Sequence, residues 1–161
     1  MNHSSHFVKI FNTMKILFIL SLVGFANVFA AATTYQAESA TVFGARVVGS
    51  YVDYINNSGD YVEWNVNASA AGVYDLDFRY ALLKDNRPLE IRINGVVVNA
   101  RLAFIVTGGW STYKTIRITK SLLRGVNKIR AVAIGASGPN MDCLIVTPSA
   151  GAPTQIGRAH V

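Results

Sequence analysis

The middle of the chain alternates apolar and polar residues with a period of two. Residues 73–81, VYDLDFRYA, place Leu76, Phe78 and two tyrosines on one face and charged side chains on the other. The segments DYVEWNVN (60–67) and PLEIRING (88–95) repeat this pattern. Strict alternation over five or more residues is typical of a strand with one buried face. We therefore predict antiparallel strands with a common apolar core.

Turn signals separate these strands. Asn94-Gly95 is typical of a two-residue hairpin, and further turns are predicted at NNSGD, ASAAG, TGGWS, LLRG and GASGPN. No segment shows the periodicity of an amphipathic helix. Short strands divided by frequent turns favour a two-sheet sandwich or jelly roll. We predict one all-β domain over residues 33–148, with a β-sandwich jelly-roll fold.

The first thirty residues predict a secretory signal peptide. They contain Lys9 and Lys15 but no acidic residue, then an apolar run from Ile16 to Phe25 and small residues before the predicted cleavage point at Ala30. The apolar run is too short to span a bilayer. Met14 is an alternative start, because all three parts of the signal follow it. We expect the mature protein to be secreted.

The end of the sequence differs in character from the rest. Residues 149–155 are mostly small and predict the start of a linker. Residues 156–161, IGRAHV, can be encoded by ATC GGA AGA GCA CAC GTC, which matches a common sequencing adapter. We interpret these six residues as a sequencing artefact and expect the parent protein to continue into another domain.

Cysteine and charge exclude some classes of function. Cys143 is the only cysteine, so no disulfide joins two parts of the chain, and its place in CLIV predicts a small buried side chain. Eight basic residues and no acidic one lie between Ile91 and Met141. They alternate with apolar residues, which indicates the solvated face of strands, although such a stretch can also attract polyanions. We expect no nucleic-acid partner.

Two tryptophans lie in different sequence contexts. Trp64 follows the apolar alternation of a strand and is predicted to be in the core, whereas Trp110 follows two glycines in a loop. An exposed aromatic ring can stack on the apolar face of a sugar ring. The alternative is that Trp110 folds back as a lid on the sandwich.

Tyr54 precedes a turn and is either a second sugar contact or strand-edge packing. Asp85, Asn86 and Arg87 lie in a predicted loop. They could hydrogen-bond the hydroxyl groups of a sugar, or they could simply form the turn.

Oxygen-bearing side chains occur near both ends of the predicted domain. Gln36 and Glu38 are two residues apart and lie on one side of a strand, and Asp142 precedes an apolar run near the C-terminus. With backbone carbonyls, these oxygens could bind Ca²⁺. Asn140, two residues before Asp142, adds an amide where a buried strand is about to begin.

These segments together resemble carbohydrate-binding modules of families 6 and 35. The resemblance rests on YQAESA, NNSGDYVEW, TGGWSTY and SGPNMDCLIV, in this order and at the expected spacing. It implies a jelly roll in which Gln36, Glu38 and Asp142 bind a structural calcium ion. It also implies that Tyr54 and Trp110 hold a sugar and that Asn140 hydrogen-bonds it. Cys143 stands where the family usually has an aromatic or similar residue.

The leading prediction is a non-catalytic module that binds polysaccharide or oligosaccharide and keeps an attached enzyme near its substrate. A glycoside hydrolase or lyase is the rival, but it would need two opposed carboxylates, and only Asp53 and Asp85 lie near predicted loop ends. A lectin-like adhesion domain is the third possibility. We expect a monomer that does not associate with a membrane once the signal is removed.

Overall fold

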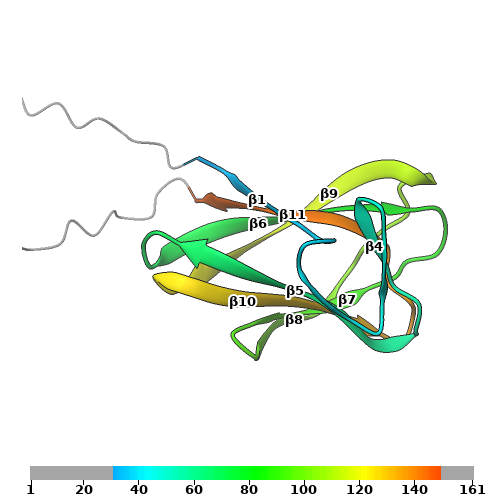
Figure 1. Ribbon diagram of the computed structural model, residues 1–161, viewed down its shortest axis with the longest axis horizontal. Coiled ribbons are helices and arrows are strands. Elements are labelled where there is room, and N and C mark those ends of the chain that lie inside the picture. Colours follow the sequence, from blue (N-terminus) through cyan, green and yellow to red (C-terminus); the bar gives the residue numbers. More distant parts are fainter. Residues whose placement is uncertain (1–30, 150–161) are drawn as a thin grey trace, which may run out of the picture.

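The computed structural model describes residues 31–149, which form a sandwich of two antiparallel β-sheets without a helix (Figure 1). No helix long and apolar enough to cross a membrane occurs between these residues. The strands are β1 (Thr33–Gln36), β2 (Thr41–Phe43), β3 (Arg46–Val48), β4 (Tyr51–Asp53), β5 (Ser58–Ala68), β6 (Gly72–Leu82), β7 (Leu89–Ile93), β8 (Val96–Leu102), β9 (Gly109–Leu122), β10 (Gly125–Ile134) and β11 (Asn140–Pro148). The predicted all-β sandwich is confirmed. The signal peptide, the artefact and the linker beyond Ser149 lie outside the described residues.

The two sheets have different strand orders. The larger sheet runs β3-β4-β11-β6-β9, with β1 also paired to β11, and the smaller sheet runs β2-β5-β10-β7-β8. The predicted hairpin joins β7 to β8, and both of its turn residues, Asn94 and Gly95, have positive φ. This is the backbone that an Asn-Gly turn adopts most readily.

The core lies between the sheets and is built from the predicted alternation. Trp64 on β5 is 2% exposed and meets Phe78 on β6 edge to face, with ring centroids 6.0 Å apart. Phe104, from the loop after β8, packs edge to face on Phe78 and Tyr80. Buried aromatic pairs of this geometry stabilise a core beyond the area that they bury.

The strand order places the loops at two opposite ends of the sandwich. Thr33 at the start of β1 pairs with Val146 near the end of β11, so the first and last described strands meet at one end (Figure 1). Asn140 begins β11 at the other end and pairs with Ala81 near the end of β6. The loops that follow β4, β6, β8 and β10 also lie at this second end, which we call the loop end.

Candidate functional site

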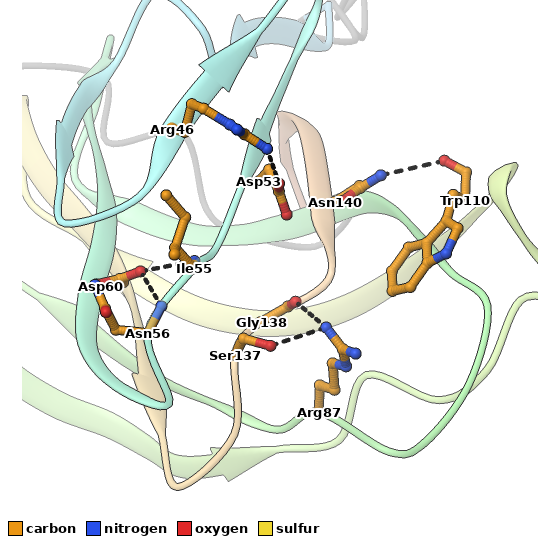
Figure 2. Close-up of polar contacts among 10 residues, drawn as sticks. All are labelled: Arg46, Asp53, Ile55, Asn56, Asp60, Arg87, Trp110, Ser137, Gly138 and Asn140. Atoms are coloured by element: carbon orange, nitrogen blue, oxygen red, sulfur yellow. Dashed lines mark hydrogen bonds and ion pairs between the residues drawn. The ribbon is translucent and has the colours of Figure 1, made fainter.

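The loop end gathers most of the residues that the sequence nominated for sugar binding. Trp110, Arg87 and Asn140 come from three different loops or strand starts and are joined by direct contacts (Figure 2). Ser137 and Gly138, in the loop before β11, complete the set. Loops held on a rigid sandwich are a common position for binding residues.

Trp110 is the exposed aromatic residue of this set. Its side chain is 38% exposed, and the Arg87 guanidinium carbon lies 5.1 Å from the centre of its ring. That distance is within the range of a cation–π interaction. The sequence predicted a loop here, but Trp110 is the second residue of β9, at a point where pairing with β6 is irregular. Its ring is therefore presented by a strand end rather than by a free loop.

Asn140 contacts Trp110 through the backbone of that residue. Its Nδ2 donates a hydrogen bond to the Trp110 carbonyl at 3.3 Å, and the residue is only 6% exposed. The family resemblance implies an amide that hydrogen-bonds a sugar. The structure instead shows an amide that is largely enclosed and is already engaged with the backbone of the exposed tryptophan.

Arg87 links the loop after β6 to the loop before β11. Its Nη1 donates to Ser137 Oγ at 2.9 Å and to the Gly138 carbonyl at 3.3 Å. Asp85 and Asn86 lie in the same loop and are exposed. Neither forms a hydrogen bond with Trp110 or Asn140 in the described chain, and Asp85 has φ of 61°, a turn conformation. Of the three residues predicted here, only Arg87 contacts the rest of the set.

Tyr54 requires a correction, because its ring is in the core. It is 2% exposed, and its hydroxyl donates to the Ala131 carbonyl at 2.9 Å. Burial raises the pKa of Tyr54 far above its usual range. Gly138 covers the ring so closely that a Cβ at Gly138 would lie 2.7 Å from Tyr54 Cγ. In this arrangement the Tyr54 ring packs beneath the loop before β11 and has no exposed face for a sugar.

Asp60 is a residue of this end that the sequence argument missed. It is 2% exposed, and its carboxylate accepts hydrogen bonds from the backbone N–H of Ile55 and Asn56 at 2.9 and 2.8 Å (Figure 2). The Asn56 side chain donates to it at 2.7 Å. A carboxylate closing a turn onto backbone N–H groups is the ordinary role of Asp in such loops. Asp60 therefore fixes the loop between β4 and β5.

Asp53 is a second acidic residue close to the set. Its carboxylate pairs with Arg46 at 2.8 Å, across the β3–β4 hairpin (Figure 2). The rival hydrolase hypothesis named Asp53 with Asp85. Asp53 is paired with an arginine, and Asp85 is an exposed turn residue.

The predicted calcium ligands lie together where β1 meets β11. Gln36 pairs with Cys143, and the Ala37 N–H donates to the Asp142 carbonyl at 2.9 Å. Glu38 Oε2 is buried and has no hydrogen-bond partner, which fits an oxygen ligand waiting for a cation. The Asp142 carboxylate contacts the Arg79 guanidinium. In residues 31–149, no three acidic, cysteine or histidine side chains converge as a ready-made metal cluster, so a calcium ion would depend on Gln36 and backbone oxygens as well.

Cys143 borders this group. The thiol is 4% exposed, and burial, followed by the neighbouring Asp142, raises its pKa to about 12. A thiol in this state is protonated at neutral pH. It acts as a small buried side chain, as the sequence predicted.

A stacked aromatic pair, the exposed Phe43 and the half-buried Tyr61, lies on the smaller sheet. Phe43 is 60% exposed and stacks on Tyr61, with ring centroids 5.3 Å apart. The Arg130 guanidinium lies 4.0 Å from the centre of the Tyr61 ring. This pair comes from β2 and β5, beside Asp60, and forms no hydrogen bond with Trp110, Arg87 or Asn140 in the described chain.

Solved structures define the class of protein to which this sandwich belongs. A family 35 carbohydrate-binding module from Clostridium thermocellum matches with a TM-score of 0.70 and 41% sequence identity, covering 74% of this chain and 100% of that one. The family 35 module from Paenibacillus barcinonensis matches with a TM-score of 0.70 and 36% identity, covering 73% and 99%. The fold is therefore that of a carbohydrate-binding module.

The sequence comparison assigns the family. The chain belongs to family 6 of the carbohydrate-binding modules, because the model of that family matches residues 26–148. Exo-β-D-glucosaminidase of Amycolatopsis orientalis is 42% identical over 120 residues, which are 67% of this chain but only 11% of that enzyme. Isomaltosyltransferase of Sporosarcina globispora is 32% identical over 98 residues and is matched over 9% of its length.

These matches have one consequence for function. The similarity to each large enzyme is confined to a small module, and solved examples of that module stand as separate carbohydrate-binding domains. The chain is therefore a non-catalytic carbohydrate-binding module, as the sequence predicted.

Proposed function

We propose that the loop end is the sugar-binding site and that Trp110 is its stacking platform. The observation that supports this most directly is the partly exposed Trp110 ring, which lies next to the Arg87 guanidinium, while the Trp110 carbonyl accepts a hydrogen bond from Asn140. An apolar ring bordered by fixed polar groups suits a sugar, which has one apolar face and a rim of hydroxyl groups. Because Tyr54 is enclosed, we propose that it supports the loop before β11 and does not contact the sugar.

We further propose that the ligand carries negative charge. Among residues 31–149, no carboxylate lies within salt-bridge distance of Arg87. Both of its hydrogen bonds leave from Nη1, so Nε and Nη2 have no partner in the described chain. A guanidinium in this state favours a carboxylate over a neutral hydroxyl, because the resulting hydrogen bonds are charge-assisted. Uronate-bearing polysaccharides supply such a group.

The biological role we propose is to hold an attached enzyme on its polysaccharide substrate outside the cell. This rests on the large relatives, in which the matched segment is a minor part of the chain, and on the signal-like N-terminus. Tethering raises the local concentration of substrate without new chemistry in the module. A lectin-like adhesion role would use the same site with a different attached domain.

Affinity electrophoresis tests the site and the ligand class together. The wild type is run in gels containing glucuronoxylan or the same polymer with its carboxyl groups reduced, beside the variants Trp110→Ala and Phe43→Ala. We expect glucuronoxylan to retard the wild type and Phe43→Ala equally, and Trp110→Ala to bind about thirtyfold or more weakly. Reduction of the carboxyl groups should remove most of the retardation.

Two other results would redirect the proposal. Equal binding to both polymers would mean that the ligand is neutral, but it would not contradict the proposed position of the site. Loss of binding in Phe43→Ala but not in Trp110→Ala would move the site to the outer face of the smaller sheet.

We propose that calcium binds at Glu38, Gln36 and Asp142 and stabilises the fold there. The unpartnered Glu38 oxygen supports this, and Asp142, whose carboxylate contacts Arg79, would supply a further oxygen ligand. A ligand bound only by the native state stabilises it by about 2.7 kcal/mol at one hundred times its Kd. Calcium should therefore raise the Tm, and Glu38→Gln should abolish most of the rise, whereas Glu90→Gln, at an ion pair with Arg92 on the other sheet, should not. An identical melting curve in millimolar calcium and in excess chelator would remove the metal from the proposal.

A further inference from the structure

Trp110 stands on a break in the pairing between β6 and β9. Ala81 pairs with Tyr113, but the next residue of β6, Leu82, pairs with Gly109. The three residues 110–112 therefore have no partner on β6. An insertion of this kind bends the strand and redirects its side chains, and here it projects the Trp110 ring from the edge of the larger sheet.

Such a break can leave backbone groups of β6 without their regular hydrogen-bond partners. Leu82 is completely buried, so its N–H and C=O need partners inside the protein. The Leu82 N–H donates to Thr107 Oγ1 at 2.7 Å, and the Leu82 carbonyl accepts from the N–H groups of Thr107 at 2.8 Å and Gly108 at 3.3 Å. The Thr107 hydroxyl is thus the acceptor for the Leu82 N–H, and the Thr107 and Gly108 backbones satisfy its carbonyl.

Thr107 is also fixed relative to the strand that carries Trp110. The residue is 7% exposed, and its Oγ1 lies 2.9 Å from the Leu82 carbonyl and 3.1 Å from the Gly109 carbonyl. Gly109 is the residue directly before Trp110. Thr107 therefore holds the start of the break, while Asn140 holds the Trp110 carbonyl beyond it.

We propose that Thr107 is a positioning residue for sugar binding, because its hydroxyl makes the Trp110 break possible. This inference rests on the proposed role of Trp110 as the platform. Valine at position 107 would occupy nearly the same volume but leave the Leu82 N–H buried without an acceptor, which is costly. The break would relax, and the Trp110 ring would lose its fixed orientation before any ligand arrived.

The test compares Thr107→Val and Thr107→Ser with Thr119→Val. Thr119 is on β9, the strand that carries Trp110, and its Oγ1 also makes a side-chain hydrogen bond, to Asp75 at 2.7 Å, but at an exposed position. Two quantities are measured in the intact chain: iodide quenching of tryptophan fluorescence, and affinity for glucuronoxylan. Because Trp64 is buried, iodide reports mainly on Trp110.

We expect Thr107→Val to increase iodide quenching and to bind glucuronoxylan about tenfold more weakly. Thr107→Ser, which keeps the hydroxyl, should restore both quantities, and Thr119→Val should change neither. Amide hydrogen exchange on the wild type adds a test that needs no variant, since the Leu82 N–H should be protected like the core strands.

The possible failures can be told apart. Unchanged quenching in Thr107→Val, or rapid exchange at Leu82, overturns the positioning role even if Trp110→Ala abolishes binding. Normal binding by Trp110→Ala overturns the proposed site instead. In that case quenching and exchange still decide whether Thr107 orients Trp110, although the role in sugar binding is lost.

Discussion

The two tryptophans of the chain show how one kind of side chain serves two opposite regions of the sandwich. Trp64 lies in the regular part of β5, paired with Ile129 of β10, and is almost completely buried. Trp110 lies where β9 loses register with β6, and more than a third of its side chain is exposed. The difference teaches that the inward phase of a regular strand places one ring in the core. A break in register presents the other ring to the solvent.

The largest expected effect is on the core side of this comparison. Trp64→Ala should lower the free energy of unfolding by about 3–5 kcal/mol, because it leaves a cavity between the sheets. Trp110→Ala should change it little, since few packing contacts are lost. Trp64→Phe is the control: the Trp64 Nε1 has no hydrogen-bond partner, so only ring volume is removed. Urea denaturation measures all three, and comparable destabilisation by the two alanine variants would make Trp110 a lid on the core.

An intermediate effect is expected at Asn140. Asn140→Ala removes the hydrogen bond to the Trp110 carbonyl and leaves that oxygen without its partner. We expect binding of glucuronoxylan to weaken by about 1–3 kcal/mol, measured by calorimetric titration or affinity electrophoresis. Asn65→Ala, an exposed amide on β5, is the matched control. If both variants bind like the wild type, Asn140 neither orients Trp110 nor contacts the sugar.

The smallest effect is expected at Tyr54. Tyr54→Phe keeps the ring beneath Gly138 but removes the hydrogen bond to Ala131, so it should cost about 1 kcal/mol of stability. Tyr74→Phe, which loses a similar bond to the Ala70 carbonyl, should cost about as much. Binding should be unchanged in both. Weaker binding by Tyr54→Phe at unchanged stability would return Tyr54 to the sugar site.

The regular strands could be predicted from the sequence because period-two alternation is a local signal. Alternation predicts Asp75 and Asp77 on the outer face of their strand, where both pair with Arg117 of β9, although Asp77 is only 8% exposed. The same rule contained the correct answer for Tyr54. It lies two residues after the buried Val52, in phase with it, so both side chains point into the core.

The irregular features of the site had no such signal. Trp110 was predicted as a loop residue because two glycines precede it, and nothing local revealed the break in pairing that presents it. The contact between Asn140 and the Trp110 carbonyl joins residues thirty positions apart. It depends on which loops the strand order brings to one end. Such contacts follow from topology, which residue-by-residue patterns do not specify.

The position of β11 has a mechanical consequence. The strand begins at Asn140 in the loop end and finishes at Pro148, where the first and last described strands meet. With the sugar site that we propose, a pull between a polysaccharide at the loop end and the opposite end of the module would act along β11. Its hydrogen bonds to β1, β4 and β6 run across that direction, so they share the load in shear instead of opening one by one. The pairing of β11 would thus resist extraction of this strand if the module tethers an enzyme as we propose.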